Sequence, residues 1–310
     1  MGVTSRDRDY VVVGETHESM IARGYSRVGA GFPVYIHPVT GEEYALARME
    51  TKTGVGYTGF VCETEGVSLE IDLYRRDLTV NAMAQSSDGS IIDPFSGRSD
   101  LESGILRHVA ADTFVEDPLR VLRVCRFLAR WPSFQIASET RDLCRSMIGE
   151  LNTIPGERMG IETTKALGEV APDRYFRSLV DLGALGIVMP ELAALIGVPQ
   201  PLAHHPEGCA FEHSMLALGQ AVRLSSDPVV RFGALVHDLG KALTPASELP
   251  SHHGHDEAGV APVESLCARL RISNEYRQAG VDAALLHTRI HRIGEARPGT
   301  VVALLGSLGV

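Results

Sequence analysis

The stretch Asp7-Arg8-Asp9-Tyr10-Val11-Val12-Val13-Gly14 decides the fold of the N-terminal part of this chain. Its three valines form a short β-branched run that is typical of a strand, and two carboxylates lead into that run. Because side chains alternate along a strand, Asp7 and Asp9 point to the same side of the predicted sheet. Such a pair can hold Mg²⁺, which prefers oxygen ligands and usually binds few carboxylates together with phosphates. An isolated Asp-x-Asp also suits a polar turn before a strand, so the rest of the chain decides between the two interpretations.

Two arginine-rich blocks lie downstream: residues 75–82, Arg-Arg-Asp-Leu-Thr-Val-Asn-Ala, and residues 116–127, Glu-Asp-Pro-Leu-Arg-Val-Leu-Arg-Val-Cys-Arg-Phe. Guanidinium groups bind triphosphates and base edges through paired hydrogen bonds. Asp117 and Arg120 are neighbours on one helix face, where an acceptor beside a donor can bind a base edge. A solvated or internally paired helix face also explains Arg76 and Asp77, and helix capping also explains Glu116 and Asp117. Together with the carboxylate pair, the two blocks predict metal-dependent nucleotidyl transfer.

Histidines gather in the last third of the chain, where nine of the 12 follow residue 203. His237 and Asp238 stand together in the apolar run 235–241, Leu-Val-His-Asp-Leu-Gly-Lys. An imidazole and a carboxylate suit a divalent transition metal, which lowers the pKa of bound water and polarises a phosphate. We expect His213, His237 and Asp238 to hold this metal, with Asp256 or Asp282 as a candidate fourth ligand. The alternative is a set of scattered surface histidines.

Length and composition limit the possible classes of protein. A chain of 310 residues can form two or more cores. Its net charge of −10 is unlike that of a general nucleic-acid binder, so an RNA partner requires a local basic patch. One candidate patch is the helical stripe Arg120, Arg123, Arg126 and Arg130. Five scattered cysteines without a C-x-x-C pair are typical of reduced thiols. The sequence contains no apolar run of about 18 residues and no signal peptide, so we expect a cytoplasmic protein without a membrane span.

The pattern of apolar and turn-forming residues divides the chain into a mixed first part and a helical remainder. We expect strands at 10–13 and 91–92, a helix at 17–24 after the N-cap Thr16, a hairpin of 33–37 with 43–48, and a helix at 68–85. From residue 99 onward the pattern is helical, with breaks at Pro132, Pro155, Pro172, Pro190, Pro199 and Pro201. Strands followed by helices favour an α+β fold over a doubly wound sheet. We therefore expect domains at 1–98, 99–197 and 198–310.

Taken in order, these motifs closely resemble the bacterial class II tRNA nucleotidyltransferases, the CCA-adding enzymes, of the multifunctional type with a C-terminal HD domain. The resemblance runs over nearly the whole chain, and its specificity comes from many short motifs in the family's order. The matching motifs are residues 7–14, Glu43-Tyr44-Ala45-Leu46-Ala47-Arg48, Gly56-Tyr57-Thr58-Gly59-Phe60, residues 75–79, Ile92-Asp93-Pro94-Phe95-Ser96-Gly97, residues 116–120, residues 232–241 and His252-His253-Gly254-His255.

The resemblance implies a small polymerase-β-like nucleotidyltransferase head, an all-α neck and body that binds nucleotide and tRNA, and an all-α HD domain. The implied activities are addition of CCA to the tRNA 3′ end from CTP and ATP, without a nucleic-acid template, and phosphohydrolysis in the HD domain. The latter acts on 2′,3′-cyclic, 2′- and other phosphate ends. Mg²⁺ is the implied cofactor of the head, and a transition metal such as Ni²⁺ or Mn²⁺ that of the HD domain. The resemblance implies no other protein partner, and a monomer or homodimer.

The family's residue roles carry over to the matching positions. The resemblance implies that Asp7 and Asp9 are catalytic and bind Mg²⁺, with Glu43 in support. In the HD domain it implies that His237 and Asp238 are catalytic and share a metal with His213. The implied nucleotide-binding residues are Arg76, Asp77, Glu116, Asp117, Arg120, Arg123 and Arg126.

The chain departs from the family at both ends. The family carries a Gly-Gly-x-x-Arg-Asp loop and a first strand before the Asp-x-Asp, whereas this chain starts at Met1-Gly2-Val3-Thr4-Ser5. Its last residues, 302–310, stop inside an apolar helical pattern. We therefore expect an incomplete head sheet and a truncated HD domain. Because the loop's amides cradle the triphosphate in the family, two alternatives remain open. They are an HD phosphohydrolase or tRNA-binding remnant with an inactive head, and a poly(A) polymerase.

Overall fold

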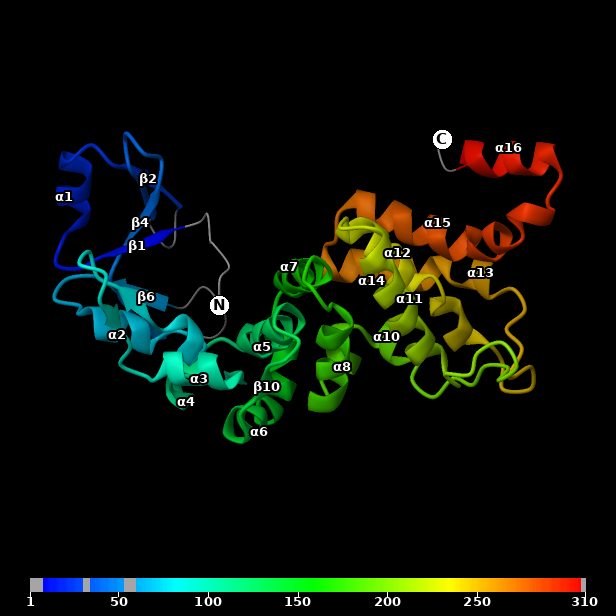
Figure 1. Cartoon of the computed structure of the whole chain (residues 1–310), viewed down its shortest axis with the longest axis horizontal. Coiled ribbons are helices and arrows are strands. Elements are labelled where there is room, and N and C mark those ends of the chain that lie inside the picture. Colours follow the sequence, from blue (N-terminus) through cyan, green and yellow to red (C-terminus); the bar gives the residue numbers. More distant parts are fainter. Residues whose placement is uncertain (1–7, 30–33, 53–59, 308–310) are drawn as a thin grey trace. The chain divides into compact units, whose positions relative to one another are not determined.

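The computed structural model of the chain describes residues 8–29, 34–52 and 60–307. Contacts divide the chain into two units (Figure 1). Unit 1 comprises residues 1–117 and 136–140, and unit 2 comprises residues 118–135 and 141–310. In the described part of the chain, every helix is too short or too polar to cross a membrane.

A four-stranded sheet organises the first part of unit 1. Its strands are β1 (Asp9–Val12), β2 (Ser26–Val28), β3 (Val34–Ile36) and β4 (Glu43–Leu46), in the order β1-β4-β3-β2. β1 runs parallel to β4, whereas β2, β3 and β4 are antiparallel neighbours. Helix α1 (His17–Ala22) starts after Thr16, whose hydroxyl accepts a hydrogen bond from the Ser19 amide. Its Met20 packs with Tyr35 and Leu46 in a small core. The strand, helix and hairpin predicted for this region are confirmed.

The rest of unit 1 consists of short elements. They are β5 (Met49–Lys52), β6 (Phe60–Glu63), α2 (Leu69–Tyr74), η1 (Thr79–Asn81), β7 (Ala84–Gln85), β8 (Ile91–Ile92), α3 (Gly97–Ser103), β9 (Ile105–Leu106) and α4 (Ala111–Phe114). The strand predicted at 91–92 is confirmed, and it pairs with β7. The single helix predicted at 68–85 is wrong beyond Tyr74. Leu78 is extended, and the Asp77 carboxylate accepts hydrogen bonds from the Leu78 amide and the Asn81 side chain. Such local bonding competes with helix formation.

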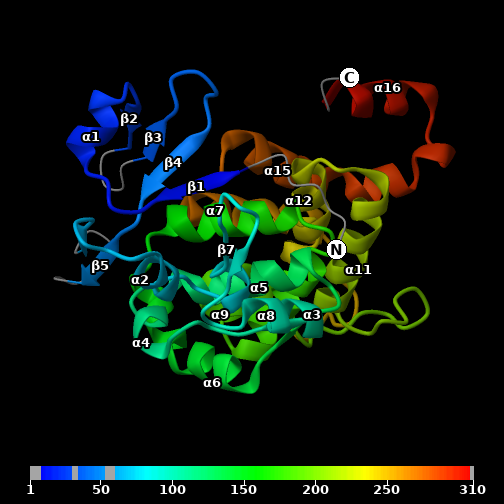
Figure 2. The ribbon, with the colours of Figure 1, turned by 60° about the vertical axis from the view of Figure 1, so that its left-hand side comes forward.

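Unit 2 is built almost entirely of helices (Figure 2). They are α5 (Leu119–Arg130), η2 (Ile148–Thr153), α7 (Gly156–Leu167), α8 (Asp173–Leu182), α9 (Leu185–Val188), α10 (Pro190–Ala193), α11 (Ala210–Leu224), α12 (Pro228–Val236), η3 (Leu239–Leu243), α13 (His255–Ala258), α14 (Val260–Leu270), α15 (Asn274–His291), η4 (Ile293–Glu295) and α16 (Pro298–Ser307). Two further elements, β10 (Gln135–Ile136) and α6 (Ser138–Ser146), contain residues of both units. Pro155, Pro172 and Pro190 stand at helix starts, where a missing amide is not needed, so these predicted breaks are confirmed.

Helix α12 packs against both α11 and α15 in unit 2. Gly280 lets α15 approach closely, because a Cβ at that position would lie 2.9 Å from the Phe232 ring of α12. This packing brings the C-terminal end of α12 beside α11 and α15. With a small sheet in unit 1 and helices throughout unit 2, the chain has the expected α+β fold. The two domain boundaries predicted at 98/99 and 197/198 stay predictions.

Candidate functional sites

Four histidines from separate elements surround Asp238 in unit 2. Asp238 directly follows the C-cap of α12 and is only 1% exposed. His237 is that C-cap, His213 lies in α11, His255 begins α13 and His287 lies in α15. Because α12 packs against α11 and α15, side chains far apart in the sequence meet around this one carboxylate.

The two carboxylate oxygens of Asp238 face different histidines. Oδ2 lies 3.1 Å from His237 Nε2 and 3.6 Å from His213 Nε2. Oδ1 lies 3.3 Å from His255 Nε2 and 3.5 Å from His287 Nε2. The three residues expected from the sequence to bind a metal therefore lie together, and two further histidines join them.

Hydrogen bonds outside the cluster orient the four rings. Nδ1 of His237, His255 and His287 each donates to a backbone carbonyl three or four residues earlier, over 2.6–3.0 Å. Nδ1 of His213 lies 2.7 Å from a Glu207 carboxylate oxygen. Carbonyl and carboxylate oxygens accept hydrogen bonds, so each Nδ1 carries the hydrogen and each neutral ring presents an Nε2 lone pair to Asp238.

At Asp238 and His287, the electrostatics of the cluster favour the protonation states that a metal requires. Burial opposes the charge of Asp238, but His237, His255 and Lys241 outweigh it and hold the pKa of this carboxyl well below its usual range. Burial lowers the pKa of His287 to about 4. At His255, burial lowers the pKa, but the nearby Asp238 carboxylate outweighs this effect and raises the net pKa, so the carboxylate also favours a proton on this ring. Metal ligands must be an anionic carboxylate and neutral imidazoles.

The donor set fits a divalent metal. His213, His237 and Asp238 form one group of converging ligand atoms, and Asp238, His255 and His287 form a second. Neither oxygen of Asp238 receives a hydrogen bond of good geometry from the described residues, although both are buried and Lys241 Nζ lies 2.7 Å from Oδ2. A buried carboxylate in that state is stabilised by a bound cation. The candidate ligands Asp256 and Asp282 instead accept hydrogen bonds from Thr288 and Gln278, outside these two groups.

His255 and His287 could not be assigned to the cluster from the sequence. His255 belongs to the motif His252-His253-Gly254-His255, but the spacing of histidines in the sequence does not show which rings reach Asp238. Their positions depend on how α13 and α15 pack around η3 and α12.

In unit 1, Asp9 and Glu43 are neighbours across the sheet. They are register partners on the parallel strands β1 and β4, and both are exposed. Residues paired in this way project from the same face. The aromatic rings of Tyr10 and Tyr44, the next pair in register, stack 4.5 Å apart and support this alignment. Asp7 lies outside the described residues, as do residues 56–59 of the quoted glycine motif.

The first arginine block surrounds a buried carboxylate. Asp72 is 1% exposed, and its oxygens lie 2.6 Å from Arg75 Nη2 and 3.3 Å from Arg76 Nη2. Arg76 also donates to the Asn81 carbonyl. Asp77, itself buried, forms the turn described above. These contacts hold the chain after α2 in one conformation, with Arg76 still partly exposed.

The second block has two different faces. Arg126 is buried on α5, where its Nε donates to Glu162 over 2.6 Å and its Nη1 to Glu169 over 3.2 Å. Arg123 is partly exposed and lies 3.9 Å from the other oxygen of Glu162. Arg120 is partly buried on the same helix, and Glu116 and Asp117 are partly buried just before it in the sequence.

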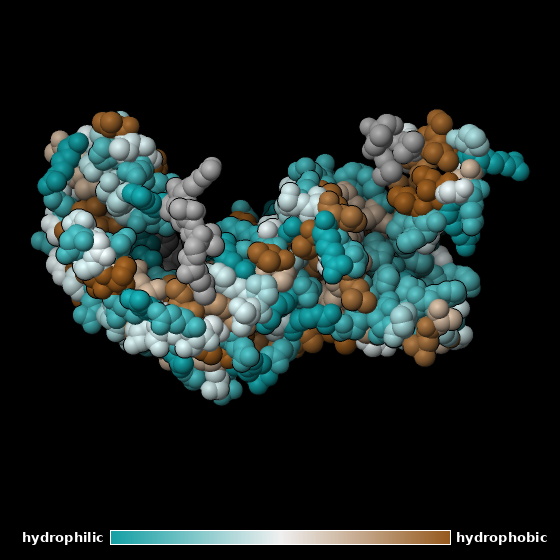
Figure 3. Space-filling view, viewed as in Figure 1, coloured by the Kyte–Doolittle hydropathy of each residue, from teal (hydrophilic) through white to brown (hydrophobic). Residues whose placement is uncertain are grey.

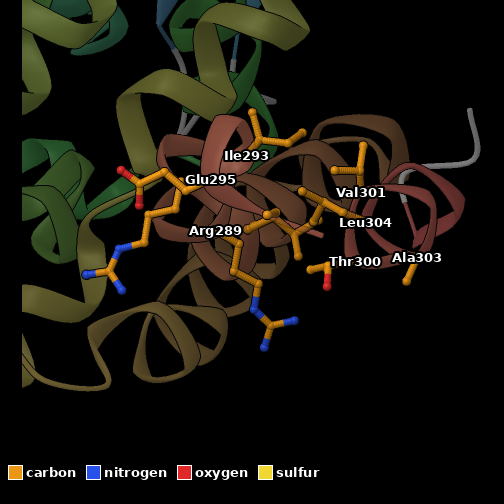
Figure 4. A pocket seen from close by; sticks show the side chains of 10 residues that line it. Arg289, Ile293, Glu295, Thr300, Val301, Ala303 and Leu304 are labelled. Carbon is orange, nitrogen blue, oxygen red and sulfur yellow. The ribbon is translucent and has the colours of Figure 1, made fainter. Parts of the chain in front are cut away.

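A separate cavity of about 480 Å³ lies in unit 2, lined by residues of α15, η4 and α16 (Figure 4). Its lining is mainly apolar and includes Leu286, Ile293 and Leu304, with Arg289, Arg292 and Glu295 at its polar part. Hydrophobic surface also gathers over α16 (Figure 3). The histidines around Asp238 are not part of this lining.

Three family models match the chain. Residues 12–107 match the poly A polymerase head domain, residues 133–196 a probable RNA- and SrmB-binding site of polymerase A, and residues 210–304 the HD domain. Nucleotidyltransferase heads and HD domains use divalent metals. The two groups of candidate ligands around Asp238 lie within the residues that match the HD domain.

Known proteins are similar to the chain over its whole length. It is 49% identical to the multifunctional CCA protein of Haemophilus influenzae (strain PittGG), over 100% of this chain and 77% of the relative. It is 51% identical to that of Thioalkalivibrio sulfidiphilus (strain HL-EbGR7), over 99% and 76%.

Solved structures share the fold. A CCA-adding enzyme in apo form II has a TM-score of 0.62 at 22% identity, over 97% of this chain and 68% of that one. A complex of a CCA-adding enzyme with CTP has a TM-score of 0.59 at 22% identity, over 95% and 65%. At this identity the structures support the fold alone. The sequence identity to the two relatives is decisive, and the chain belongs to the family of multifunctional CCA proteins.

Proposed function

We propose that this protein adds CCA to the 3′ end of tRNA, using CTP and ATP without a nucleic-acid template. The observation that carries the proposal is the pairing of Asp9 with Glu43 on β1 and β4, in a chain about half identical to multifunctional CCA proteins. The tRNA 3′ hydroxyl attacks the α-phosphate, a new P–O bond forms, and pyrophosphate leaves. We further propose that the protein is cytoplasmic, because tRNA is its substrate. We also propose that it is a monomer or a homodimer.

In the proposed head site, Asp7 and Asp9 hold Mg²⁺, with Glu43 beside them. Bound Mg²⁺ stabilises the charge on the attacking and leaving oxygens. Asp77 and Arg76 position the nucleotide after α2, and Glu116, Asp117, Arg120, Arg123 and Arg126 act around α5. We assign the contact with base or phosphate to the partly exposed members of this set. Arg126 has a positioning role, because Glu162 and Glu169 occupy its guanidinium.

We propose phosphohydrolysis for the histidine cluster of unit 2. His213, His237 and Asp238 would hold a divalent metal such as Mn²⁺ or Ni²⁺, which supplies an activated water and polarises phosphate. The substrates are 2′,3′-cyclic, 2′- and other phosphate ends of RNA. Lys241 lies 2.7 Å from Asp238 Oδ2 and donates to Gln200, so it neutralises the buried carboxylate and steadies its orientation.

A phosphohydrolase without nucleotide transfer is the second candidate. It is favoured by the histidine cluster, whose proposed ligands all lie within unit 2. A poly(A) polymerase is the third, favoured by the description of the matched head model.

Incorporation of labelled CTP and ATP into tRNA lacking its CCA end tests the proposal directly. We expect ordered addition of C, C and A with Mg²⁺, abolished by Asp9→Ala. Repeated addition of A alone would identify a poly(A) polymerase. If no nucleotide is added while 2′,3′-cyclic phosphate is hydrolysed, the phosphohydrolase candidate is correct. The double variant His237→Ala with Asp238→Ala should lose hydrolysis of 2′,3′-cyclic phosphate and should keep the nucleotide addition of the wild type.

A further inference from the structure

Asp238 has ligand-like neighbours on both of its oxygens. His237 and His213 lie on the Oδ2 side, together with Lys241. His255 and His287 lie on the Oδ1 side, and no described lysine or arginine pairs with that oxygen. One metal bound by the first pair of histidines leaves the second pair and Oδ1 without a cation.

When the His255 and His287 rings are neutral, their hydrogens do not place a positive charge beside Asp238 Oδ1. Nδ1 of His255 and Nδ1 of His287 each donate to a backbone carbonyl, which only accepts. The two Nε2 atoms therefore present lone pairs. They lie 3.0 Å from one another and 3.3 and 3.5 Å from Asp238 Oδ1. Three acceptors that converge in this way repel one another unless a cation or a proton lies between them.

The spacing of these three atoms matches that of ligands on one metal. Ligand atoms about 2.1 Å from a metal lie about 3.0–3.4 Å apart at angles between octahedral and tetrahedral. Two of the observed separations, 3.0 and 3.3 Å, fall within that range, and the third, 3.5 Å, lies just above it. The rings are also held in place by elements of their own, since His255 begins α13 and His287 lies within α15.

We propose that Asp238 Oδ1, His255 and His287 hold a second divalent cation, and that Asp238 bridges it to the cation held by His213 and His237. This inference rests on the proposed phosphohydrolase site and extends it to a dinuclear centre. Two metals about 3.5–4 Å apart can bind the attacking water and the phosphate together. The water oxygen bonds to phosphorus while the bond from phosphorus to a ribose oxygen breaks. The proton that the water loses ends on the ribose oxygen, so the products are a phosphate and a hydroxyl group.

Binding of Mn²⁺ alone to the tag-free full chain tests the proposal. All proteins in this test carry Asp9→Ala, so that the proposed metal site of the head adds no Mn²⁺ to the count. Equilibrium dialysis should give about two Mn²⁺ per chain, and electron paramagnetic resonance should show exchange coupling between them. His255→Ala and His287→Ala should each leave about one Mn²⁺ per chain and an uncoupled spectrum. His213→Ala should also leave about one, because the second position remains. His253→Ala and His291→Ala, exposed neighbours of the two ligands, are matched controls and should keep both ions.

Contrary results would distinguish failure of the second cation site from failure of the proposed phosphohydrolase site. One uncoupled Mn²⁺ per chain that survives His255→Ala and His287→Ala but not His237→Ala would overturn the second position, and the metal of the proposed phosphohydrolase would stand. A protonated His255 would then explain the short contacts. Absence of bound Mn²⁺ from the chain that carries Asp9→Ala alone would overturn both. The coupled spectrum of the chain that carries Asp9→Ala alone decides the question even if a histidine variant fails to fold.

Discussion

Glu207 Oε1 lies 2.7 Å from His213 Nδ1, and the opposite nitrogen of the same ring faces Asp238. Glu207 also lies 3.1 Å from His205. The carboxylate thus fixes both the orientation of the His213 ring and the nitrogen that carries its hydrogen. Carboxylates behind metal-binding histidines act in this way, and they raise the basicity of the ring.

Glu207→Ala should weaken Mn²⁺ binding by about 10- to 100-fold, because His213 loses the group that orients it. Glu207→Gln keeps an acceptor at the same place and should retain part of the affinity. The matched control is Glu248→Ala. Glu248 is exposed in the loop after η3, and its substitution should leave Mn²⁺ binding unchanged. Calorimetric titration with Mn²⁺ measures the affinity of the wild type and of the three variants. Equal affinities of Glu207→Ala and the wild type would show that His213 needs no support from Glu207.

Gly240 allows α13 to approach the histidine cluster around Asp238. A Cβ at this position would lie 1.9 Å from the His255 carbonyl oxygen and 2.6 Å from the Gly259 amide nitrogen. Gly240→Ala should therefore displace α13 and lower the free energy of unfolding of unit 2 by about 1–3 kcal/mol. Urea denaturation followed by far-UV circular dichroism measures this change.

The control for this prediction is Gly219→Ala in α11, where an added Cβ meets no atom within 4 Å. That change should be neutral or slightly stabilising, because alanine favours a helix over glycine. If both variants unfold at the same urea concentration as the wild type, the close approach at Gly240 is not under steric constraint.

Much of the fold follows from local sequence signals. The valines of β1 and the N-cap Thr16 correctly predict the first strand and helix, because both signals act within a few residues. The helix predicted at 68–85 ends early because the Asp77 side chain binds the Leu78 amide and Asn81. An apolar period does not reveal that competition, since it depends on the conformation of a single aspartate.

Long-range partners limit what the sequence predicts at the sites. His213, His237 and Asp238 meet as expected, because the His-Asp pair is a local signal within an apolar helix end. The two histidines on the Oδ1 side depend on the packing of α13 and α15. Likewise, the stripe of arginines on α5 looks uniform in the sequence, yet Arg126 meets Glu162 of a distant helix and is buried. The partner of a long side chain cannot be read from helical spacing alone.

Arg126→Ala should lower the free energy of unfolding of unit 2 by about 3–5 kcal/mol, because it leaves Glu162 buried without its main partner. Glu162 is itself 3% exposed and accepts from Arg126 over 2.6 Å. Adding Glu162→Leu to Arg126→Met should restore part of the stability, since no buried charge then lacks a partner. Chemical denaturation of the three proteins gives these differences.

The control is Arg98→Ala, which removes an exposed ion pair with Glu102 and should cost less than about 1 kcal/mol. A variant Arg126→Ala that keeps full stability and loses only affinity for CTP and ATP would contradict the positioning role. It would instead assign Arg126 to direct nucleotide binding.

Asp72→Asn should lower the stability of unit 1 by about 1–3 kcal/mol at neutral pH, because hydrogen bonds to a charged acceptor are lost or weakened. Asp72 accepts from the Arg48 amide and from Arg75, and it lies close to Arg76. Burial opposes its charge, but Arg75 and then Arg76 outweigh this effect and lower the pKa of the carboxyl.

This pKa shift fixes the sign of the pH dependence. An aspartate whose folded pKa lies below its unfolded value of about 3.9 contributes its full stabilisation above that value. The contribution is lost as the pH falls through the folded pKa. Wild type and Asp72→Asn should therefore differ most above about pH 5 and converge as the pH falls below about 4. Urea denaturation between these values tests this, with the exposed Glu65→Gln in the same unit as control. A difference that stays constant down to the lowest pH would mean that the arginines stabilise the side chain without depending on its charge.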